Sequence, residues 1–263
     1  MTSQDFEYLM YEKKDRVARI TMNRPEKHNA LNMGLINELS KALADAEEDD
    51  DVKVILLRGA GKSFCSGADL NQFMEFAAGK GNPIELGVVL HYGVIKKIRE
   101  MEKVVVTELK GYVIGAGLGL AMASDYAVAA ESTTFSAGFT LVGLSPDTGT
   151  SFFIPRTTSM KRAFEIMATA RTFSAREALE YGLVTEVVPD NELADRVEKV
   201  VGTLLNRPRV AIAHLKKLLN ATYSNRLDEH LGYELTLAMK SAISEDFIEG
   251  VTAMLQKREP KFK

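Results

Sequence analysis

Backbone amides in a glycine-rich turn are the first groups in this chain that could do chemistry. Residues 111–125 contain Gly115, Gly117 and Gly119, where a β-branched segment at 104–109 is followed by small apolar residues that can begin a buried helix. The first amides of a helix have no carbonyl partner within it, and they favour a negative charge, either a phosphate or an oxyanion formed during a reaction. Glycines are equally typical of a tight packing turn, so this stretch alone does not establish a site.

A second turn of the same kind occurs earlier in the chain. Residues 59–70 are rich in small side chains and follow an apolar, β-branched segment at 52–58. Alternation of strands and helices is typical of parallel strands, whose carboxyl ends share one edge of the sheet, and ligands bind at that edge. We therefore expect two amides, one from each turn, to hold one oxygen atom.

The elements that must position these turns follow from hydrophobic periodicity. Asn32 can cap a helix with Leu35, Ile36, Leu39, Leu43 and Ala46 on its apolar face. Residues 71–90, which contain three glycines and a proline, are expected to be irregular and mobile, and residues 91–101 to be helical. Helical patterns dominate from about residue 160. Strands are predicted at residues 8–13, 17–22, 52–58, 104–109, 126–130 and 134–136.

Composition narrows the class of protein. The 263 residues are 46% hydrophobic and 26% charged, and 33 Lys and Arg against 36 Asp and Glu give a net charge of −3. We expect neither nucleic acid nor a membrane as a partner. The single cysteine, Cys65, fits a reducing compartment, and no signal sequence or long apolar run is found. A cytoplasmic location is therefore expected, and no residues have the spacing of metal ligands.

Five sequence motifs together indicate a family. They are Arg-Pro-x-x-x-Asn-Ala-Leu at 24–31, Phe-x-x-Gly-x-Asp-Leu at 64–70, the glycine-rich turn at 111–125, Ala-x-x-x-Gly-Leu-Val at the end of 173–184, and the segment 249–262. With these motifs, the chain resembles the crotonase superfamily of enoyl-CoA hydratases and isomerases along almost its whole length. The resemblance implies an α/β fold: a spiral of ββα turns (ClpP-like) over residues 1–195. It also implies a helical region at 196–263 that assembles homotrimers or dimers of trimers.

The same resemblance implies the site. The substrate would be an acyl-CoA thioester, with coenzyme A as part of the substrate and no permanently bound cofactor or metal. The oxyanion donors would be the backbone amides of Ala68 and Ala116. The coenzyme A site would comprise Lys27, His28, Ala30, Ser66, Gly67, Ala68, Asp69, Leu70 and Lys257. The acyl pocket would comprise His91, Tyr92, Gly119, Phe139 and Leu144.

Departures from the family pattern bear on the reaction. Hydratases of this family use two glutamates, and Gly119 and Phe139 stand at those positions. Asp147 resembles instead the single aspartate of phenylacetate-type enoyl-CoA isomerases, and one carboxylate suffices for a 1,3-proton shift. Asp147 could alternatively cap a helix beginning at Thr148. A helix start would lower its pKa, whereas an apolar pocket with Phe152 would raise it.

Three alternatives to an isomerase remain. The first is a hydratase, and the second is a non-catalytic acyl-CoA-binding scaffold, which would show no proton exchange at the α or γ carbon. The third is a hydrolytic aryl-CoA dehalogenase with Asp147 as nucleophile. Thr148 and Arg156 also resemble residues in the corresponding segment of that enzyme. That enzyme needs a tryptophan and a histidine base, but this chain has no tryptophan. Ungapped alignment puts Tyr92 at the base position, with His91 one residue away.

Overall fold

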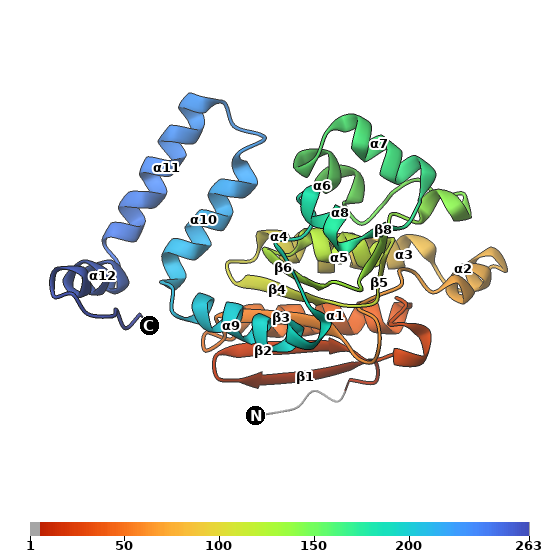
Figure 1. Cartoon of the computed structure of the whole chain (residues 1–263), viewed down its shortest axis with the longest axis horizontal. Coiled ribbons are helices and arrows are strands. Elements are labelled where there is room, and N and C mark those ends of the chain that lie inside the picture. Colours follow the sequence, from red (N-terminus) through yellow and green to blue (C-terminus); the bar gives the residue numbers. More distant parts are fainter. Residues whose placement is uncertain (1–5, 263) are drawn as a thin grey trace.

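A six-stranded sheet forms the centre of the protein (Figure 1). The computed structural model describes residues 6–262. The antiparallel hairpin β1–β2 lies at one edge, and every other neighbouring pair is parallel. In spatial order the strands are β1 (Leu9–Lys14), β2 (Val17–Met22), β3 (Val54–Gly59), β4 (Val104–Leu109), β6 (Tyr126–Ala130) and β9 (Glu186–Val188).

A smaller row of extended segments runs beside the large sheet. Parallel single bridges join Leu31 to Ala68 and Cys65 to Val113, and they continue the row formed by the strands of the small sheet. Successive turns of the chain thus contribute a strand to the large sheet, an extended segment to the small row, and a helix, which is the predicted ββα spiral. The small sheet consists of β5 (Tyr112–Ile114), β7 (Thr134–Ser136) and β8 (Phe173–Ser174).

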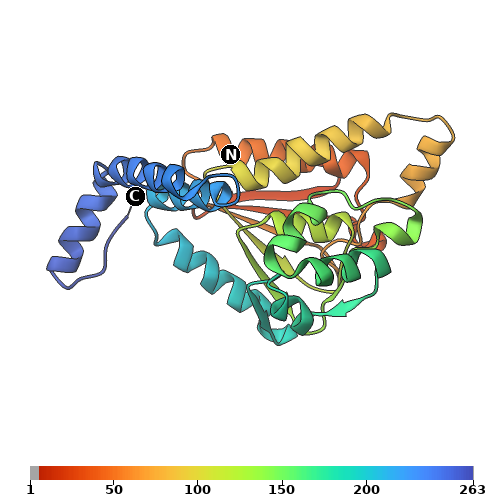
Figure 2. The same ribbon diagram turned by 90° about the horizontal axis from the view of Figure 1, so that it is seen from above.

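Helices cover both faces of the large sheet (Figure 2). On one face lies α1 (Met33–Glu48), which the Asn32 side chain caps by accepting the Leu35 amide at 2.9 Å. The predicted apolar face of α1 is buried. On the opposite face lies α9 (Leu193–Leu205), which packs against the valines of β2, β3, β4 and β6. The short α5 (Ala116–Ala123) is buried over its whole length.

The expectation that residues 71–90 are irregular was wrong. They form α2 (Leu70–Ala77) and α3 (Pro83–Val88), capped by the side chains of Asp69 and Asn82. The glycines that suggested irregularity lie mostly between the two helices. The helix that begins with α3 continues through a π-helical segment, η2 (Val89–Lys96), into α4 (Lys97–Glu100).

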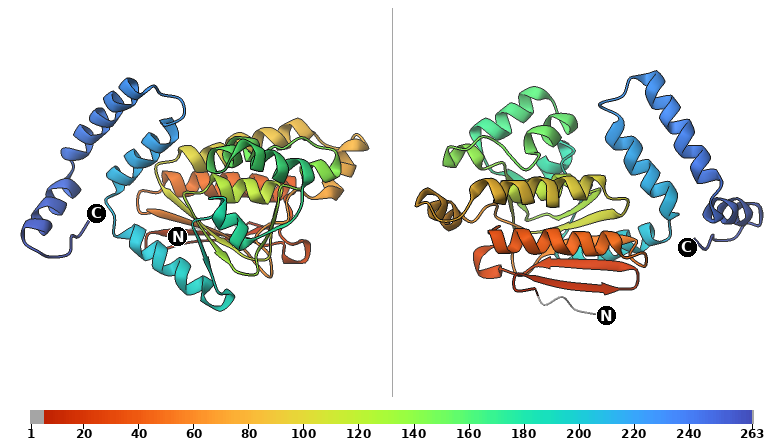
Figure 3. Two further views of the ribbon diagram at one scale, coloured as in Figure 1. Left: turned by 45° about the horizontal axis from the view of Figure 1, so that its top comes forward. Right: turned by 180° about the vertical axis from the view of Figure 1, so that it is seen from behind.

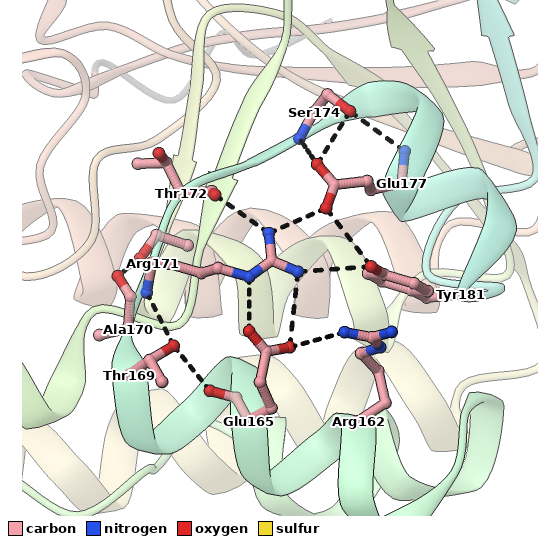
Figure 4. Close-up of polar contacts among 10 residues, drawn as sticks. Arg162, Glu165, Thr169, Ala170, Arg171, Thr172, Ser174, Glu177 and Tyr181 are labelled. Atoms are coloured by element: carbon pink, nitrogen blue, oxygen red, sulfur yellow. Dashed lines mark hydrogen bonds and ion pairs between the residues drawn. The ribbon is translucent and has the colours of Figure 1, made fainter.

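A polar network ties together the elements that follow the glycine-rich turn (Figure 4). The Arg171 guanidinium donates to Glu165 on α7 and, at 2.8 Å, to Glu177 on α8. Ser174 and Glu177 form a capping box at the start of α8. The network therefore joins two helices through β8.

The helices of this region are α6 (Thr150–Thr157), α7 (Met160–Thr169) and α8 (Ala175–Glu180). Short 3-10 turns are η1 (Pro25–Lys27), η3 (Phe139–Val142) and η4 (Asp190–Glu192).

Three C-terminal helices form an arm that projects from the sheet (Figures 1 and 3). They are α10 (Arg209–Ala221), α11 (Leu227–Ala242) and α12 (Glu245–Leu255). The predicted boundary at residue 195 falls inside α9, whose buried residues belong to the sheet core. The boundary is therefore better drawn after α9, where the chain leaves the sheet.

Candidate active site

The two glycine-rich turns meet because neither has side chains at the point of contact. Gly67 and Gly115 have φ values of +94° and +54°, a region that favours glycine. A Cβ on Gly67 would lie 2.9 Å from the Ile114 carbonyl oxygen and 3.7 Å from the Ala116 amide nitrogen. The Ile114 amide also donates to the Cys65 carbonyl at 3.0 Å. The geometry thus brings both turns to one place, as the sequence predicts.

Two backbone amides are left unpaired at this meeting point. On either side of Ala68, the chain bonds to Leu31: the Gly67 carbonyl accepts from the Leu31 amide at 2.8 Å, and the Asp69 amide donates to the Leu31 carbonyl at 2.9 Å. This pattern leaves the Ala68 amide free. Ala116 is the first residue of α5 and has no carbonyl partner. Within residues 6–262, neither amide makes a hydrogen bond, and both residues line a cavity of about 370 Å³.

Most of the predicted site residues line this cavity. They are Lys27, Ala30, Ser66, Gly67, Ala68, Asp69, Leu70, Ala116, Phe139, Leu144 and Asp147. Sequence reasoning missed the apolar part of the wall, Leu31, Ile36, Phe73, Leu86, Leu90, Ile114, Leu141 and Val142. Phe73 and Leu86 lie on α2 and α3, in the segment expected to be irregular. The helical spacing of apolar residues there was the signal that could have found them.

Two predicted coenzyme A residues lie outside this wall. His28 contacts the Ser63 hydroxyl through Nδ1 at 3.0 Å, and its ring packs edge-on against Tyr112. Lys257 follows α12 at the far end of the arm (Figure 1). Neither residue lines the cavity. Their proposed roles rest on the family resemblance alone.

Asp147 lines the same cavity as the amides of Ala68 and Ala116. It does not cap a helix, because α6 begins at Thr150 after Gly149 and has no side-chain cap. Its backbone carbonyl accepts from the Thr150 amide at 3.0 Å. The carboxylate oxygen Oδ1 is buried and has no hydrogen-bond partner among the described residues. Burial raises the pKa of Asp147, although the nearby His91 and the Thr148 hydroxyl act in the opposite direction.

The other carboxylate in the wall is already engaged. Asp69 accepts from Arg24 Nη2 at 2.9 Å through one oxygen and from the Asn71 amide at 3.1 Å through the other. Both side chains of the Asp69–Arg24 pair are largely buried. Asp147 is therefore the one carboxylate of the cavity wall, within residues 6–262, that is available to exchange a proton.

Neither of the two positions at which hydratases carry glutamates holds a carboxylate in this chain, and the structural reason differs between Gly119 and Phe139. A Cβ on Gly119 would lie 2.3 Å from the Thr148 hydroxyl and 2.5 Å from the Thr148 carbonyl oxygen. No side chain therefore fits at residue 119 while Thr148 stays in place. Phe139 is buried and forms part of the cavity wall. An apolar ring thus stands where the second carboxylate would be.

His91 and Tyr92 do not line the cavity that contains the amides of Ala68 and Ala116. Both line a second cavity of about 870 Å³, and Asp147 lines both cavities. His91 Nε2 accepts the Thr148 amide at 3.3 Å. Tyr92 is 64% exposed. His91, and not Tyr92, is therefore the neighbour of the Asp147–Thr148 segment.

Comparison with known proteins agrees with this geometry. The family model described as enoyl-CoA hydratase/isomerase matches residues 12–263. The chain belongs to this family. It is 32% identical to the 1,2-epoxyphenylacetyl-CoA isomerase of Escherichia coli K12 over 257 residues, which cover 97% of this chain and 98% of the relative. It is also 36% identical to a probable enoyl-CoA hydratase of Rhodobacter capsulatus over 255 residues, which cover 97% of both chains.

Solved structures of enoyl-CoA hydratase/isomerases confirm the crotonase fold. A crystal structure of a putative enoyl-CoA hydratase from Streptomyces coelicolor A3(2) matches with a TM-score of 0.94 at 29% identity, covering 100% of this chain and 96% of that one. Within residues 6–262, no group of three or more His, Cys, Asp or Glu could hold a metal ion. No helix in this range is long and apolar enough to cross a membrane.

Proposed function

We propose that this enoyl-CoA hydratase/isomerase family member is an isomerase that moves a carbon–carbon double bond along an acyl-CoA thioester. The observation that supports it is a carboxylate, Asp147, whose buried Oδ1 atom has no hydrogen-bond partner among the described residues and which lines the same cavity as two amides, Ala68 and Ala116, that make no hydrogen bond there. Lys27, Ser66 and Leu70 line that cavity as well, which fits a thioester whose coenzyme A part lies along this wall.

In the proposed reaction the thioester carbonyl oxygen accepts hydrogen bonds from both amides. The Asp147 carboxylate removes a proton from the carbon at one end of the allylic system, and the electron pair of that C–H bond delocalises into a dienolate. The charge settles on the carbonyl oxygen, where loss of one amide donor would cost a factor of about 10²–10³ in rate. Protonated Asp147 then returns the proton to the other end, so neither water nor a redox partner is consumed.

Hydratase activity is less well supported. Adding water requires one group to activate the water and another to protonate carbon. Asp69 is held by Arg24, and Gly119 and Phe139 supply no carboxylate. The contact between Gly119 and Thr148 also leaves no room for the missing glutamate.

A second candidate is the aryl-CoA dehalogenase, because His91 lies beside the Asp147–Thr148 segment. There Asp147 would attack a ring carbon, halide would leave, and water would hydrolyse the resulting aryl ester with His91 as base. The tryptophan that this chemistry uses is missing, since the chain contains none. The isomerase is therefore the better supported proposal.

A panel of 2-enoyl, 3-enoyl and aromatic CoA esters, incubated in heavy water and followed by mass spectrometry, tests the proposal. We expect a shifted double bond without added oxygen, together with deuterium in the acyl group to the extent that protonated Asp147 exchanges with solvent before it returns the proton. Gain of water would instead indicate a hydratase, and release of halide a dehalogenase. Esters that bind but show neither a shifted double bond nor exchange would make the protein a scaffold and end the isomerase proposal.

We further propose that copies of this chain cover the arm, as a trimer or a dimer of trimers. The support is a row of apolar side chains at four-residue intervals on α11, each more than half exposed: Leu227, Leu231, Leu235 and Met239. Such a continuous apolar stripe is unusual for a free surface. Sedimentation velocity should give three or six chains for the wild type and fewer for Leu231→Glu. A wild-type protein that sediments as one chain would rule out this assembly.

A further inference from the structure

The orientation of the Asp147 carboxylate depends on Thr148, the next residue, whose side chain is the one that hydrogen-bonds to this carboxyl. Its Oδ1 atom is buried without a partner among the described residues. The fixed parts of this segment are in the backbone. The Asp147 carbonyl accepts from the Thr150 amide and hydroxyl, at 3.0 and 2.8 Å, and Thr148 forms the next peptide. Whatever holds Thr148 therefore aims the carboxylate.

Thr148 is held from two sides in a conformation that it would not adopt freely. Its φ is +50°, which is unfavourable for a β-branched residue, and it is 1% exposed. Its side chain fills the space left by the missing side chain of Gly119 on α5. Its amide, on the other side, donates to His91 Nε2. α5 thus fixes the side chain of Thr148, and His91 fixes its peptide plane.

His91 reaches this amide from the π-helical segment η2. A π-helix is wider than an α-helix and is often found at functional sites, where it changes the direction of a side chain. In this contact Nε2 is the hydrogen-bond acceptor, which assigns the ring proton to Nδ1. A glutamine at residue 91 can place its Oε1 atom close to the position that the histidine Nε2 atom occupies, whereas a leucine has no hydrogen-bond acceptor in its side chain.

We propose that His91 is the positioning residue for Asp147: by accepting the Thr148 amide, it holds the Asp147–Thr148 peptide so that Oδ1 of the carboxylate stays available in the cavity that the Ala68 and Ala116 amides line. This inference rests on the proposed isomerase function. It differs from the dehalogenase role, in which the imidazole itself would take a proton from water. His91 here transfers no proton.

Two substitutions separate these roles. In His91→Leu the Thr148 amide loses its acceptor, and we expect kcat to fall about 100-fold, as for a catalytic group displaced by about 1 Å, with KM little changed. In His91→Gln the acceptor remains, and kcat should stay within about threefold of wild type. His214→Gln is the matched control, because His214 bonds to Ser241 on the arm, away from both cavities.

The second measurement needs no turnover: exchange of the Thr148 amide with deuterium, resolved by fragmentation in the mass spectrometer. Exchange should be slow in wild type, His91→Gln and His214→Gln, and fast in His91→Leu. Fast exchange in the wild type would overturn the proposal even if His91→Leu does not fold.

Two kinetic outcomes would also overturn the proposal. If His91→Gln protects Thr148 but is as slow as His91→Leu, the imidazole takes part in the chemistry. If His91→Leu turns over like the wild type, His91 has no role in aiming Asp147. A wild-type protein that isomerises no ester refutes the isomerase function instead, and the exchange measurement still decides whether His91 holds Thr148.

Discussion

Two groups of acidic side chains in this protein have opposite surroundings. Around β8, Glu165 and Glu177 share the guanidinium of Arg171, and Glu177 also accepts from the Ser174 amide (Figure 4). In the loop before α6, the Asp147 carboxylate has a buried oxygen with no partner among the described residues. Hydrogen bonds from Arg171 and the Ser174 amide lower the pKa of the two glutamates, whereas burial raises the pKa of Asp147.

The difference distinguishes carboxylates that hold the fold from one that is available for chemistry. A paired carboxylate is stabilised in its charged form and does not readily take a proton. A buried and unpaired one is less stable when charged, so it can take a proton from carbon and give it back. A raised pKa brings the acid and base forms closer in free energy, which is what a single shuttle requires. Strained backbone at Thr148 beside it fits the same pattern.

The strongest test of this contrast is Asp147→Asn. Because the amide cannot accept a proton from carbon, we expect isomerisation to fall by a factor of about 10³ or more. Binding of a CoA ester should persist, since the substitution leaves the amides of Ala68 and Ala116 unchanged. Steady-state kinetics and calorimetric titration with a saturated acyl-CoA measure the two effects. An active asparagine variant would refute the assignment of Asp147.

The same variant tests the electrostatic part of the contrast. The pKa of Asp147 is raised above its ordinary value of 3.8. The folded state therefore binds the Asp147 proton more tightly than the unfolded state does. The stability that this group contributes is complete below the unfolded-state pKa and is lost as the pH rises through the folded-state pKa. We expect Asp147→Asn to be more stable than wild type at neutral pH, with the gap closing in acid. Urea titrations at several pH values would show this, and a less stable variant at neutral pH would contradict it.

Gly119→Ala should have the next largest effect. Its new Cβ would lie 2.3 Å from the Thr148 hydroxyl, so Thr148 must move and carry Asp147 with it. We expect a rate loss of about 100-fold, together with a loss of about 1–3 kcal/mol in unfolding free energy from overpacking.

The control for Gly119→Ala is Gly87→Ala on α3, where a Cβ would meet nothing within 4 Å. That substitution should leave the rate unchanged and stabilise the helix by about 0.5–1 kcal/mol. Equal kinetic effects of the two alanines would show that packing against Thr148 does not aim Asp147.

Arg171→Gln should have the smallest effect, and on stability alone. The side chains of this network are about one third exposed, so the ion pairs are screened by water, and we expect a loss of about 1 kcal/mol at neutral pH. The lowered pKa values of Glu165 and Glu177 mean that their contribution is present above the unfolded-state values and is lost as the pH falls. The difference from wild type should therefore shrink in acid, and isomerisation should not change. A rate loss comparable with that of Gly119→Ala would erase the contrast between the two regions.

Much of the site could be predicted because its parts are local in sequence. Glycine is required at Gly67 and Gly115 by positive φ and close contact, so the two turns are visible as patterns. The parallel order of the strands then brings them together. The helices α2 and α3 were missed because the glycines near them were given more weight than the helical spacing of the apolar residues, which include Phe73 on α2 and Leu86 on α3. The contacts that hold Thr148 beside Asp147 could not be predicted, because they come from α5 and η2.

The sequence by itself determined the first five strands of the large sheet, the helix that Asn32 caps, the two glycine-rich turns and the absence of glutamates at Gly119 and Phe139. Each of these depends on residue type and short spacing, which act through backbone conformation and hydrophobic burial. Only the tertiary structure decided that Asp69 is held by Arg24, that Oδ1 of Asp147 has no partner within residues 6–262, and that His91 accepts the Thr148 amide. Such pairings join residues that are distant in the chain, and the availability of a carboxylate depends on which groups the folded protein places around it.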